Sequence, residues 1–189
     1  CMTVRIKGTG SCLPKTVITN DYLAGIMETS DEWISSRTGI RERRLVKEEN
    51  TTYLSSEAAK AALKDSGISV DEIDLILVAT ITGDYTTPST ACMVQAEIGA
   101  SNAIAFDIQG ACAGFMFALH TAYAYMQMGV YKKALVIGAE TLSKIMDWQD
   151  RSTCVLFGDG AGAVVLESDM VGLLAFDQGS DGERGKVLT

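Results

Sequence analysis

One cysteine stands where protein side chains often act as nucleophiles. An apolar run, Ala103 to Phe106, predicts a buried strand before Cys112, and the almost uncharged stretch Met116 to Met128 predicts a helix after it. Its neighbours are small: Gly110, Ala111, Ala113 and Gly114. Small neighbours let another backbone or a ligand come close. Because a helix N-terminus stabilises a thiolate, we predict that Cys112 is a nucleophile, with a buried structural cysteine as the alternative.

No partner base for this thiol is predicted nearby. His120, the only histidine, lies eight positions after Cys112 in the same predicted helix. That spacing corresponds to a rise of about 12 Å, beyond the hydrogen-bond reach of a general base. We therefore expect His120 to be packed or surface-facing. Glu140 and Asp159 are predicted to be structural, not an acid/base pair.

A second group of candidate residues follows a predicted helix start. Thr29 and Glu32 have the spacing of a capping box, and the helix is expected to stop near Gly39. Trp33 and Arg37 are four residues apart and therefore share a face of this helix. On pattern alone, Trp33 anchors the helix to the core and Arg37 is solvated beside it.

Strands and helices alternate between Leu75 and Ile137, which positions Cys112 within a sheet. Apolar runs predict buried strands at 75–79, 103–106 and 134–137. A helix is predicted from Pro88 to Ile98, closed by Gly99. This order predicts a parallel sheet with right-handed crossovers, covered on both sides. The helix after Cys112 is apolar nearly all round and is expected to be central.

A glycine-rich run near the end superficially fits the dinucleotide fingerprint. It extends from Gly158 to Ala163. That fingerprint needs a following helix, but Val164 to Leu166 predicts a strand, and Asp159 would place a negative charge near a pyrophosphate. We therefore expect no nucleotide cofactor and predict a tight turn with close backbone packing. Val171 to Phe176 is a further candidate strand.

The composition excludes several classes of protein. The chain has 189 residues, 47% of them hydrophobic, which is ample for one domain spanning 1–189. The net charge of −8 argues against a nucleic-acid partner. Five cysteines without a Cys-x-x-Cys pair favour free thiols in a reducing compartment, and a single histidine leaves no usual metal cluster. No apolar run reaches membrane-spanning length and no signal-peptide core is present, so a cytoplasmic protein is expected.

Three separated motifs stand in order along the chain. The first is Thr29-Ser30-Asp31-Glu32-Trp33-Ile34 with Arg37-Thr38-Gly39-Ile40, the second surrounds Cys112, and the third is Asp150-Arg151-Ser152-Thr153 with Phe157-Gly158-Asp159-Gly160-Ala161-Gly162-Ala163. Together they resemble the β-ketoacyl-acyl carrier protein synthase III family of the thiolase superfamily. The resemblance covers nearly the whole chain but about half of the usual family length. Residues 1–189 would be the N-terminal of two duplicated halves, and the family's catalytic histidine and asparagine would lie in the other.

This resemblance implies a fold and a reaction. The fold would be thiolase-like α/β, a five-layer αβαβα arrangement when complete. The reaction would be the decarboxylative condensation of an acyl-CoA primer with malonyl-acyl carrier protein, which initiates fatty acid synthesis. Cys112 would attack the primer thioester and release CoA, and its backbone N–H would supply half of an oxyanion hole. No cofactor is implied, because acyl-CoA is a substrate.

The resemblance also implies roles for other residues. Trp33 and Arg151 would flank the CoA adenine, Arg37 would contact CoA, and Thr29 would lie nearby. Thr87 stands where relatives often carry a bulky residue that reaches the partner subunit's acyl pocket. A smaller side chain there predicts a longer or branched primer.

The implied partners follow from the same resemblance. They are acyl-CoA, malonyl-acyl carrier protein, a second polypeptide carrying the missing half, and a second copy in a homodimer. The most basic stretch, Arg41-Glu42-Arg43-Arg44, is either a solvated strand edge or a docking site for the acidic carrier protein.

Two other functions stay open on the sequence. One is a different thiolase-fold condensing enzyme, such as a polyketide starter synthase or a 3-hydroxy-3-methylglutaryl-CoA synthase. The other is a non-catalytic half that only binds CoA or a partner surface.

Overall fold

The main sheet of the protein is mixed and five-stranded. The computed structural model describes residues 2–172 and 175–188, and the strand order is β1-β7-β6-β4-β5. The strands are β1 (Thr3–Cys12), β4 (Leu75–Ala79), β5 (Ile104–Ile108), β6 (Lys133–Thr141) and β7 (Asp159–Asp169). β4 pairs in parallel with β5 and β6, whereas β7 is antiparallel to β6 and β1. The predicted parallel sheet between Leu75 and Ile137 is therefore confirmed. The prediction of a buried strand at 103–106 is wrong, because β5 lies at the edge of the sheet and Ile104 is 55% exposed.

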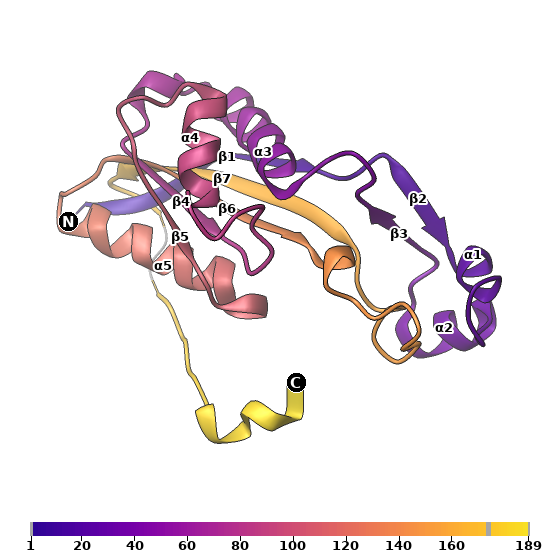
Figure 1. Cartoon of the computed structure of the whole chain (residues 1–189). Helices are drawn as coiled ribbons and strands as arrows, with labels where there is room; N and C mark the ends of the chain where they lie inside the picture. Colours follow the sequence, from indigo (N-terminus) through magenta and orange to yellow (C-terminus); the bar gives the residue numbers. More distant parts are fainter. Residues whose placement is uncertain (1, 173–174, 189) are drawn as a thin grey trace.

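Helices cover both faces of this sheet (Figure 1). α3 (Thr51–Ser66) and α4 (Thr90–Ile98) pack on one face, and α5 (Gly114–Gln127) packs on the other. Alternate residues of β4 serve the two layers: Ile76 and Val78 join the α3 side, and Leu75 and Leu77 join the α5 side. Side chains of a strand point alternately to opposite faces, so a central strand must be apolar at every position. All five residues of β4 are buried.

Two glycines of β1 let α3 come very close to the sheet. A Cβ at Gly8 would lie 2.4 Å from the backbone N of Ser66, and one at Gly10 would lie 2.3 Å from the carbonyl oxygen of Ala58. Both atoms belong to the helix backbone, which cannot move aside without shifting α3. Glycine is therefore required at both positions for this helix–strand packing.

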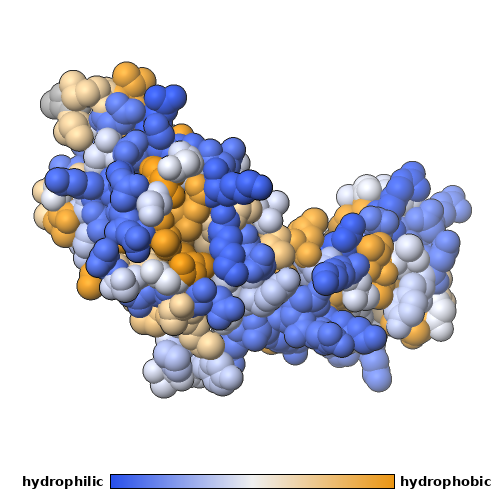
Figure 2. Space-filling view, turned by 90° about the horizontal axis from the view of Figure 1, so that it is seen from above, coloured by the Kyte–Doolittle hydropathy of each residue, from blue (hydrophilic) through white to orange (hydrophobic). Residues whose placement is uncertain are grey.

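A separate arm extends from the sheet (Figure 1). It contains the antiparallel pair β2 (Thr16–Thr19) and β3 (Glu42–Leu45), with α1 (Asn20–Ala24) and α2 (Asp31–Thr38). The arm has its own small core, formed by Leu23, Ile34, Cys154 and Val155. Two members of that core come from the segment after β6, so this segment joins the arm to the main sheet. From above, the two lobes are connected by a narrower waist (Figure 2).

The helix ends largely follow the predicted signals. Gly39 ends α2 and Gly99 ends α4 with φ of 73° and 78° in the left-handed region. The predicted capping box of Thr29 and Glu32 is wrong, because the N-cap of α2 is Ser30, whose hydroxyl accepts the N–H of Trp33 at 3.0 Å. The helix therefore starts at Asp31.

The glycine-rich run is a strand and not the tight turn that we predicted. Gly160 and Gly162 lie within β7, and Gly162 pairs with Ser11 of β1 and Gly138 of β6. A strand interior is not the strand–turn–helix context of a dinucleotide fingerprint. Two residues of the predicted strand Val171 to Phe176, 173 and 174, lie outside the described residues, and those described on either side are not in a strand.

The helix after Cys112 is not enclosed on all sides within the described residues: it packs on the sheet, and Phe176 stacks on His120. Ala118, Leu119, Ala122 and Met126 are buried against the sheet, whereas Met116 is 46% exposed. No helix in residues 2–172 and 175–188 is long and apolar enough to cross a membrane.

Candidate active site

Three segments that carry candidate residues follow the carboxyl ends of neighbouring strands. β4, β5 and β6 run in parallel, so their carboxyl ends lie together. The segment after β5 carries Cys112, the one after β4 carries Thr87, and the one after β6 carries Arg151. In open α/β sheets, ligands bind beyond the carboxyl ends of the strands. The topology therefore sends all three segments off the same end of the sheet, although Arg151 itself lies in the arm beside Trp33.

Cys112 lies on a strained turn between β5 and α5. It is the middle residue of the 3-10 helix η2 (Ala111–Ala113), two residues before α5 starts, and not in the first turn of α5 itself. Ala111 has a φ of 46°, in the left-handed region, which costs a non-glycine residue roughly 1–3 kcal/mol. The turn packs tightly, because a Cβ at Gly110 would lie 2.6 Å from the Phe117 ring. Such strain is typical of residues held in place for function.

The surroundings of Cys112 suit an attacking thiolate. The side chain is exposed, and no side chain caps the N-terminus of α5, where Ala113 is the N-cap. Within the turn, the N–H of Ala113 donates to the carbonyl oxygen of Gly110 at 3.1 Å, and the N–H of Gly114 donates to that of Ala111. Free N–H groups at a helix start favour a negative charge, whether on sulfur or on an oxyanion.

The other described cysteines are less suited to chemistry. Burial raises the pKa of both Cys12 and Cys154, and nearby carboxylates raise them further. Cys92 is exposed, but its thiol lies 3.4 Å from the carbonyl oxygen of Ala105 and can donate to it. Cys112 therefore has the most accessible thiol without a described acceptor.

Carboxylates near the strand ends are occupied by hydrogen bonds. Glu140 accepts from the N–H of Ile81 at 2.9 Å and from the hydroxyls of Thr80 and Thr82. Asp159 accepts from the N–H of Val46 at 2.8 Å and from Ser143. Both carboxylates therefore hold neighbouring backbone and hydroxyl groups in place, as expected of structural residues.

The loop between β4 and α4 is held at several points. Burial raises the pKa of Asp84, but hydrogen bonds from Thr52 and Lys144 outweigh it and lower the pKa overall. Asp84 thus fastens the loop to the start of α3. Asp107 accepts the N–H groups of Thr90 and Ala91, at 2.8 and 2.7 Å, and fastens the start of α4.

Between these anchors, the tip of the loop is open. Tyr85, Thr86, Thr87 and Pro88 are all exposed. Anchored on both sides, the loop can present Thr87 in a defined place to a neighbouring molecule.

Three of the predicted CoA-binding residues meet in the arm. The guanidinium carbons of Arg37 and Arg151 lie 4.6 and 5.0 Å from the centroid of the Trp33 ring. Arg151 also donates to the carbonyl oxygen of Glu28 at 2.6 Å. The neighbouring Thr29 hydroxyl is buried and finds no hydrogen-bond partner among the described residues.

The distance between the Trp33 ring and the Arg151 guanidinium limits whether an adenine can lie between them. A flat ring needs about 3.5–4 Å on each side, so a sandwich between Trp33 and a guanidinium needs roughly 7–8 Å. The observed 5.0 Å between Trp33 and Arg151 leaves no room for one. An adenine between them must therefore displace the Arg151 side chain by roughly 2–3 Å.

Arg151 is presented by a hydrogen-bonded turn. The Asp150 carboxylate accepts from the N–H and hydroxyl of Ser152, at 2.9 and 2.6 Å, and from the Thr153 hydroxyl at 2.9 Å. Hydrogen bonds from Ser152, then Thr153, lower the pKa of Asp150. The carboxylate therefore stays ionised and holds the turn on which Arg151 stands.

The sequence pattern did not predict that Arg43 is buried. It is only 6% exposed, although the stretch Arg41 to Arg44 was predicted to be a solvated edge or a docking site. The available signal was alternation: Arg43 and Leu45 are two residues apart in β3 and share its inner face. A docking role for this stretch would have to rest on Arg41 and Arg44.

Two other features of the structure lie away from these residues. One groove has a volume of about 680 Å³, lies between the base of the arm and α3 and α4, and includes none of the predicted site residues. It is lined by Lys15, Thr16, Lys47, Glu48, Glu49, Asn50, Thr52, Tyr53, Met93 and Glu97. In the part of the chain that the structure describes, no group of three His, Cys, Asp or Glu side chains could hold a metal ion.

Known proteins resemble this chain along nearly its whole length. A family model described as 3-oxoacyl-[acyl-carrier-protein] synthase III matches residues 106–182. The β-ketoacyl-[acyl-carrier-protein] synthase III of Clostridium botulinum is 54% identical over 187 residues, which are 98% of this chain and 57% of that protein.

Solved structures agree with this match. The crystal structure of 3-oxoacyl-(acyl carrier protein) synthase III from Pseudomonas aeruginosa has a TM-score of 0.92 at 43% identity, covering 96% of this chain and 58% of that one. The crystal structure of the priming β-ketosynthase from the R1128 polyketide biosynthetic pathway has a TM-score of 0.87 at 37% identity, covering 90% and 51%.

The chain thus spans just over half the length of the curated relative, 57%. The match extends over both the arm and the sheet, and it confirms the predicted thiolase-like α/β fold. The chain belongs to the β-ketoacyl-[acyl-carrier-protein] synthase III family.

Proposed function

We propose that this chain is the nucleophile-bearing part of an acyltransferase that condenses an acyl-CoA primer with malonyl-acyl carrier protein. The observation that carries the proposal is the exposed Cys112 on its strained turn, directly before the uncapped N-terminus of α5. Family membership supports the substrates, because the relatives are named as synthases that act with acyl carrier protein.

The proposed chemistry has two stages. The Cys112 thiolate attacks the thioester carbonyl, an S–C bond forms, and the C–S bond to CoA breaks, which leaves an acyl-cysteine. CoA leaves as its thiolate and takes up a proton equivalent to the one that Cys112 gave up. The malonyl thioester then loses CO2, and the carbanion equivalent attacks the acyl carbonyl and expels the Cys112 thiolate. The backbone N–H of Cys112 would supply one half of an oxyanion hole. The base and the second donor are expected outside this chain, and no cofactor takes part.

The arrangement of the molecule also supports the other proposed partners. The exposed tip with Thr87, and β5 at the edge of the sheet with Ile104 55% exposed, are compatible with a homodimer. A second half of the fold would cover the open side of α5. Free cysteines favour a cytoplasmic location.

The direct test of this proposal is formation of an acyl-cysteine. The complete protein, with the remainder of the fold present, is incubated with acyl-CoA and analysed by intact mass and peptide mapping. We expect one acyl group per chain, on Cys112, released when malonyl-acyl carrier protein is added. A protein that binds CoA but never acquires an acyl group would instead support a non-catalytic binding half.

A first prediction concerns the arm. Arg151→Ala and Trp33→Ala should each raise the dissociation constant for acyl-CoA about tenfold or more, because stacking on a base is worth roughly 1–3 kcal/mol. Isothermal titration measures the constant, and thermal unfolding shows whether the fold is kept. Arg5→Ala is the matched control, since Arg5 is an exposed arginine on β1, paired with Asp169 at 3.7 Å. Unchanged affinity in folded variants would remove the adenine-clamp assignment.

A second prediction concerns the length of the primer. Thr87 is small and exposed, so we expect the complete protein to accept branched or medium-chain acyl-CoA as well as acetyl-CoA. Thr87→Phe should shift kcat/KM toward acetyl-CoA by about tenfold, the value of a filled apolar pocket. Thr86→Phe adds the same ring one position earlier and should not shift the preference. A preference for acetyl-CoA that Thr87→Phe leaves unchanged would contradict the idea.

One alternative has a specific observation in its favour. The solved priming β-ketosynthase is a polyketide enzyme that shares the fold at 37% identity, so the condensation could start a polyketide. The two functions share the acyl-cysteine and differ in the carrier protein that delivers the malonyl group. A comparison of carrier proteins from fatty acid and polyketide synthesis in the condensation assay distinguishes them.

A further inference from the structure

The arm contains a buried arginine without a nearby carboxylate. Arg43 is 6% exposed, and among the described residues no Asp or Glu oxygen lies within ion-pair distance of it. Its guanidinium donates to three acceptors instead: the carbonyl oxygen of Ile18 at 3.2 Å, the side-chain oxygen of Asn20 at 2.8 Å, and the carbonyl oxygen of Val155 at 3.1 Å. Burial lowers the pKa of Arg43, although a guanidinium stays protonated.

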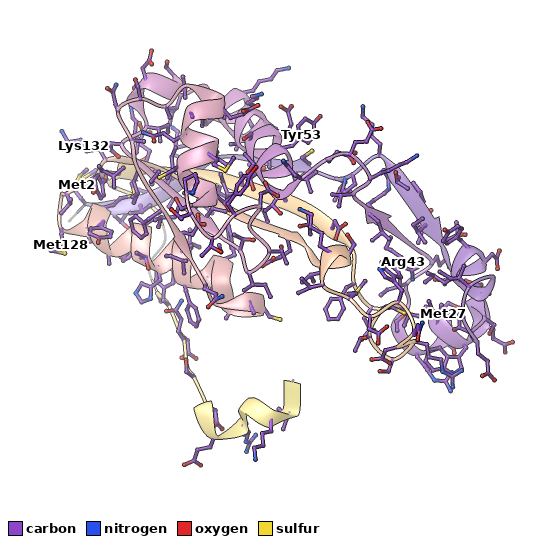
Figure 3. The ribbon with its side chains drawn as sticks, in the orientation of Figure 1. Met2, Met27, Arg43, Tyr53, Met128 and Lys132 are labelled. Atoms are coloured by element: carbon purple, nitrogen blue, oxygen red, sulfur yellow. The ribbon has the colours of Figure 1, made fainter. Side chains whose placement is uncertain are left out.

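The three acceptors belong to three different parts of the molecule. Ile18 is in β2, Asn20 is the first residue of α1, and Val155 follows the turn that carries Arg151. Figure 3 shows Arg43 within the arm, beside the segment that reaches over from β6. Arg43 therefore connects the arm to the Arg151 turn directly.

Asn20 extends this connection to the helix that carries Trp33. Its amide nitrogen donates to the Asp31 carboxylate at 2.8 Å and to the carbonyl oxygen of Ile40 at 2.7 Å. Asp31 is the first residue of α2, and Ile40 lies two residues after its end. Asn20 is itself almost fully buried, at 1% exposed. One amide thus holds both ends of α2, and its oxygen holds Arg43.

These bonds form a continuous path between the two sides of the proposed nucleotide site. The path leads from α2, which carries Trp33 and Arg37, through Asn20 and Arg43 to Val155, four residues after Arg151. We propose that Arg43 and Asn20 are positioning residues that set the distance between Trp33 and Arg151 for the nucleotide part of acyl-CoA. This inference rests on the proposed function.

The chemistry of the guanidinium explains why arginine fits this place. Its planar fork holds several N–H groups in fixed directions, so one side chain can satisfy acceptors from three elements at once. A lysine has one nitrogen on a flexible stem and cannot reach all three. An apolar residue would leave the buried carbonyls of Ile18 and Val155 without a hydrogen-bond donor, which would destabilise the folded protein.

The test separates nucleotide binding from acyl transfer. Arg43→Lys and Asn20→Ala are made in the complete protein, with Arg44→Lys as the control, since Arg44 is on the same strand and donates only to the Pro14 carbonyl in the described structure. Acylation of Cys112 is measured with acyl-CoA and with acyl-pantetheine, which has the same thioester but no nucleotide. We expect KM for acyl-CoA to rise about tenfold in both variants, whereas acyl-pantetheine reacts as in the wild type.

Each possible result decides the matter. If the rate of Cys112 acylation falls equally with acyl-CoA and with acyl-pantetheine, the role of Arg43 and Asn20 is merely structural. An unchanged KM for acyl-CoA would show that they have no role. A wild-type protein without any preference for acyl-CoA over acyl-pantetheine would instead contradict the proposed nucleotide site itself. The part of the tryptophan fluorescence that is lost in Trp33→Phe gives a second readout: this Trp33 signal should change in Arg43→Lys and Asn20→Ala but not in Arg44→Lys. An unchanged Trp33 signal in both variants would also overturn the inference.

Discussion

Replacing Cys112 by alanine is expected to abolish acyl transfer while the protein stays folded. Without the thiolate no acyl-enzyme can form, so the rate should fall by about 10³-fold or more. The side chain is exposed, and its removal leaves no cavity in either sheet core. Acylation by acyl-CoA, followed by intact mass, measures the loss in the complete protein.

Alkylation provides the matched control for this prediction. Limiting iodoacetamide should label Cys112 before the other described thiols, because burial protects Cys154 and raises its pKa and that of Cys12. Cys92 is also exposed, and Cys92→Ala should keep full acyl transfer. Preferential labelling of Cys12, Cys92 or Cys154, or an acyl adduct on Cys112→Ala, would show that the nucleophile has been assigned wrongly.

The sequence predicts those features that depend on short-range patterns. The uniformly apolar run at Leu75 to Ala79 predicts a strand covered on both faces, and the structure has a fully buried strand there. Gly39 and Gly99 end their helices as predicted, because a left-handed residue there favours glycine. The turn at Cys112 was also placed between a strand and a helix, although α5 starts two residues later than Cys112.

Features that depend on distant partners were not predicted correctly. The glycine-rich run became a strand because β1, more than 140 residues earlier, pairs with it: Gly10 lies opposite Ala163. Arg43 lies inside because acceptors at Ile18, Asn20 and Val155 replace water, and a charged stretch gives no local sign of them. Local patterns cannot show which buried carbonyls need a donor.

The candidate site shows the same division. That Trp33 and Arg37 share a face follows from their spacing, and the structure places the guanidinium carbon of Arg37 4.6 Å from the Trp33 ring centroid. That Arg151 joins them could be inferred only from the family resemblance, because 118 positions separate it from Trp33 and a separate segment brings it there. The distance of 5.0 Å, and with it the need for Arg151 to move, comes from the structure alone.

The last prediction is that residues 1–189 alone do not catalyse condensation. Decarboxylation and carbon–carbon bond formation need groups that stabilise an enolate and a second oxyanion donor. In the described part of the chain, the only histidine is engaged elsewhere: Nδ1 of His120 donates to the side-chain oxygen of Gln178 at 2.7 Å, and the ring stacks on Phe176 at 4.3 Å between centroids. Apolar side chains such as Met116 and Ile104 are also 46% and 55% exposed, which soluble monomers rarely tolerate in continuous patches.

The experiment compares the 189-residue chain with the same chain supplemented by the remainder of the fold, taken from a relative that it matches over 57% of the length. Solubility, oligomeric state and release of CO2 from malonyl-acyl carrier protein are measured for both. We expect the chain alone to associate and to show no condensation, and the supplemented protein to condense in a manner that depends on Cys112. A soluble, monodisperse 189-residue chain that condenses by itself would show that its own residues supply the base and the second oxyanion donor, and that neither group belongs to the other half of the fold.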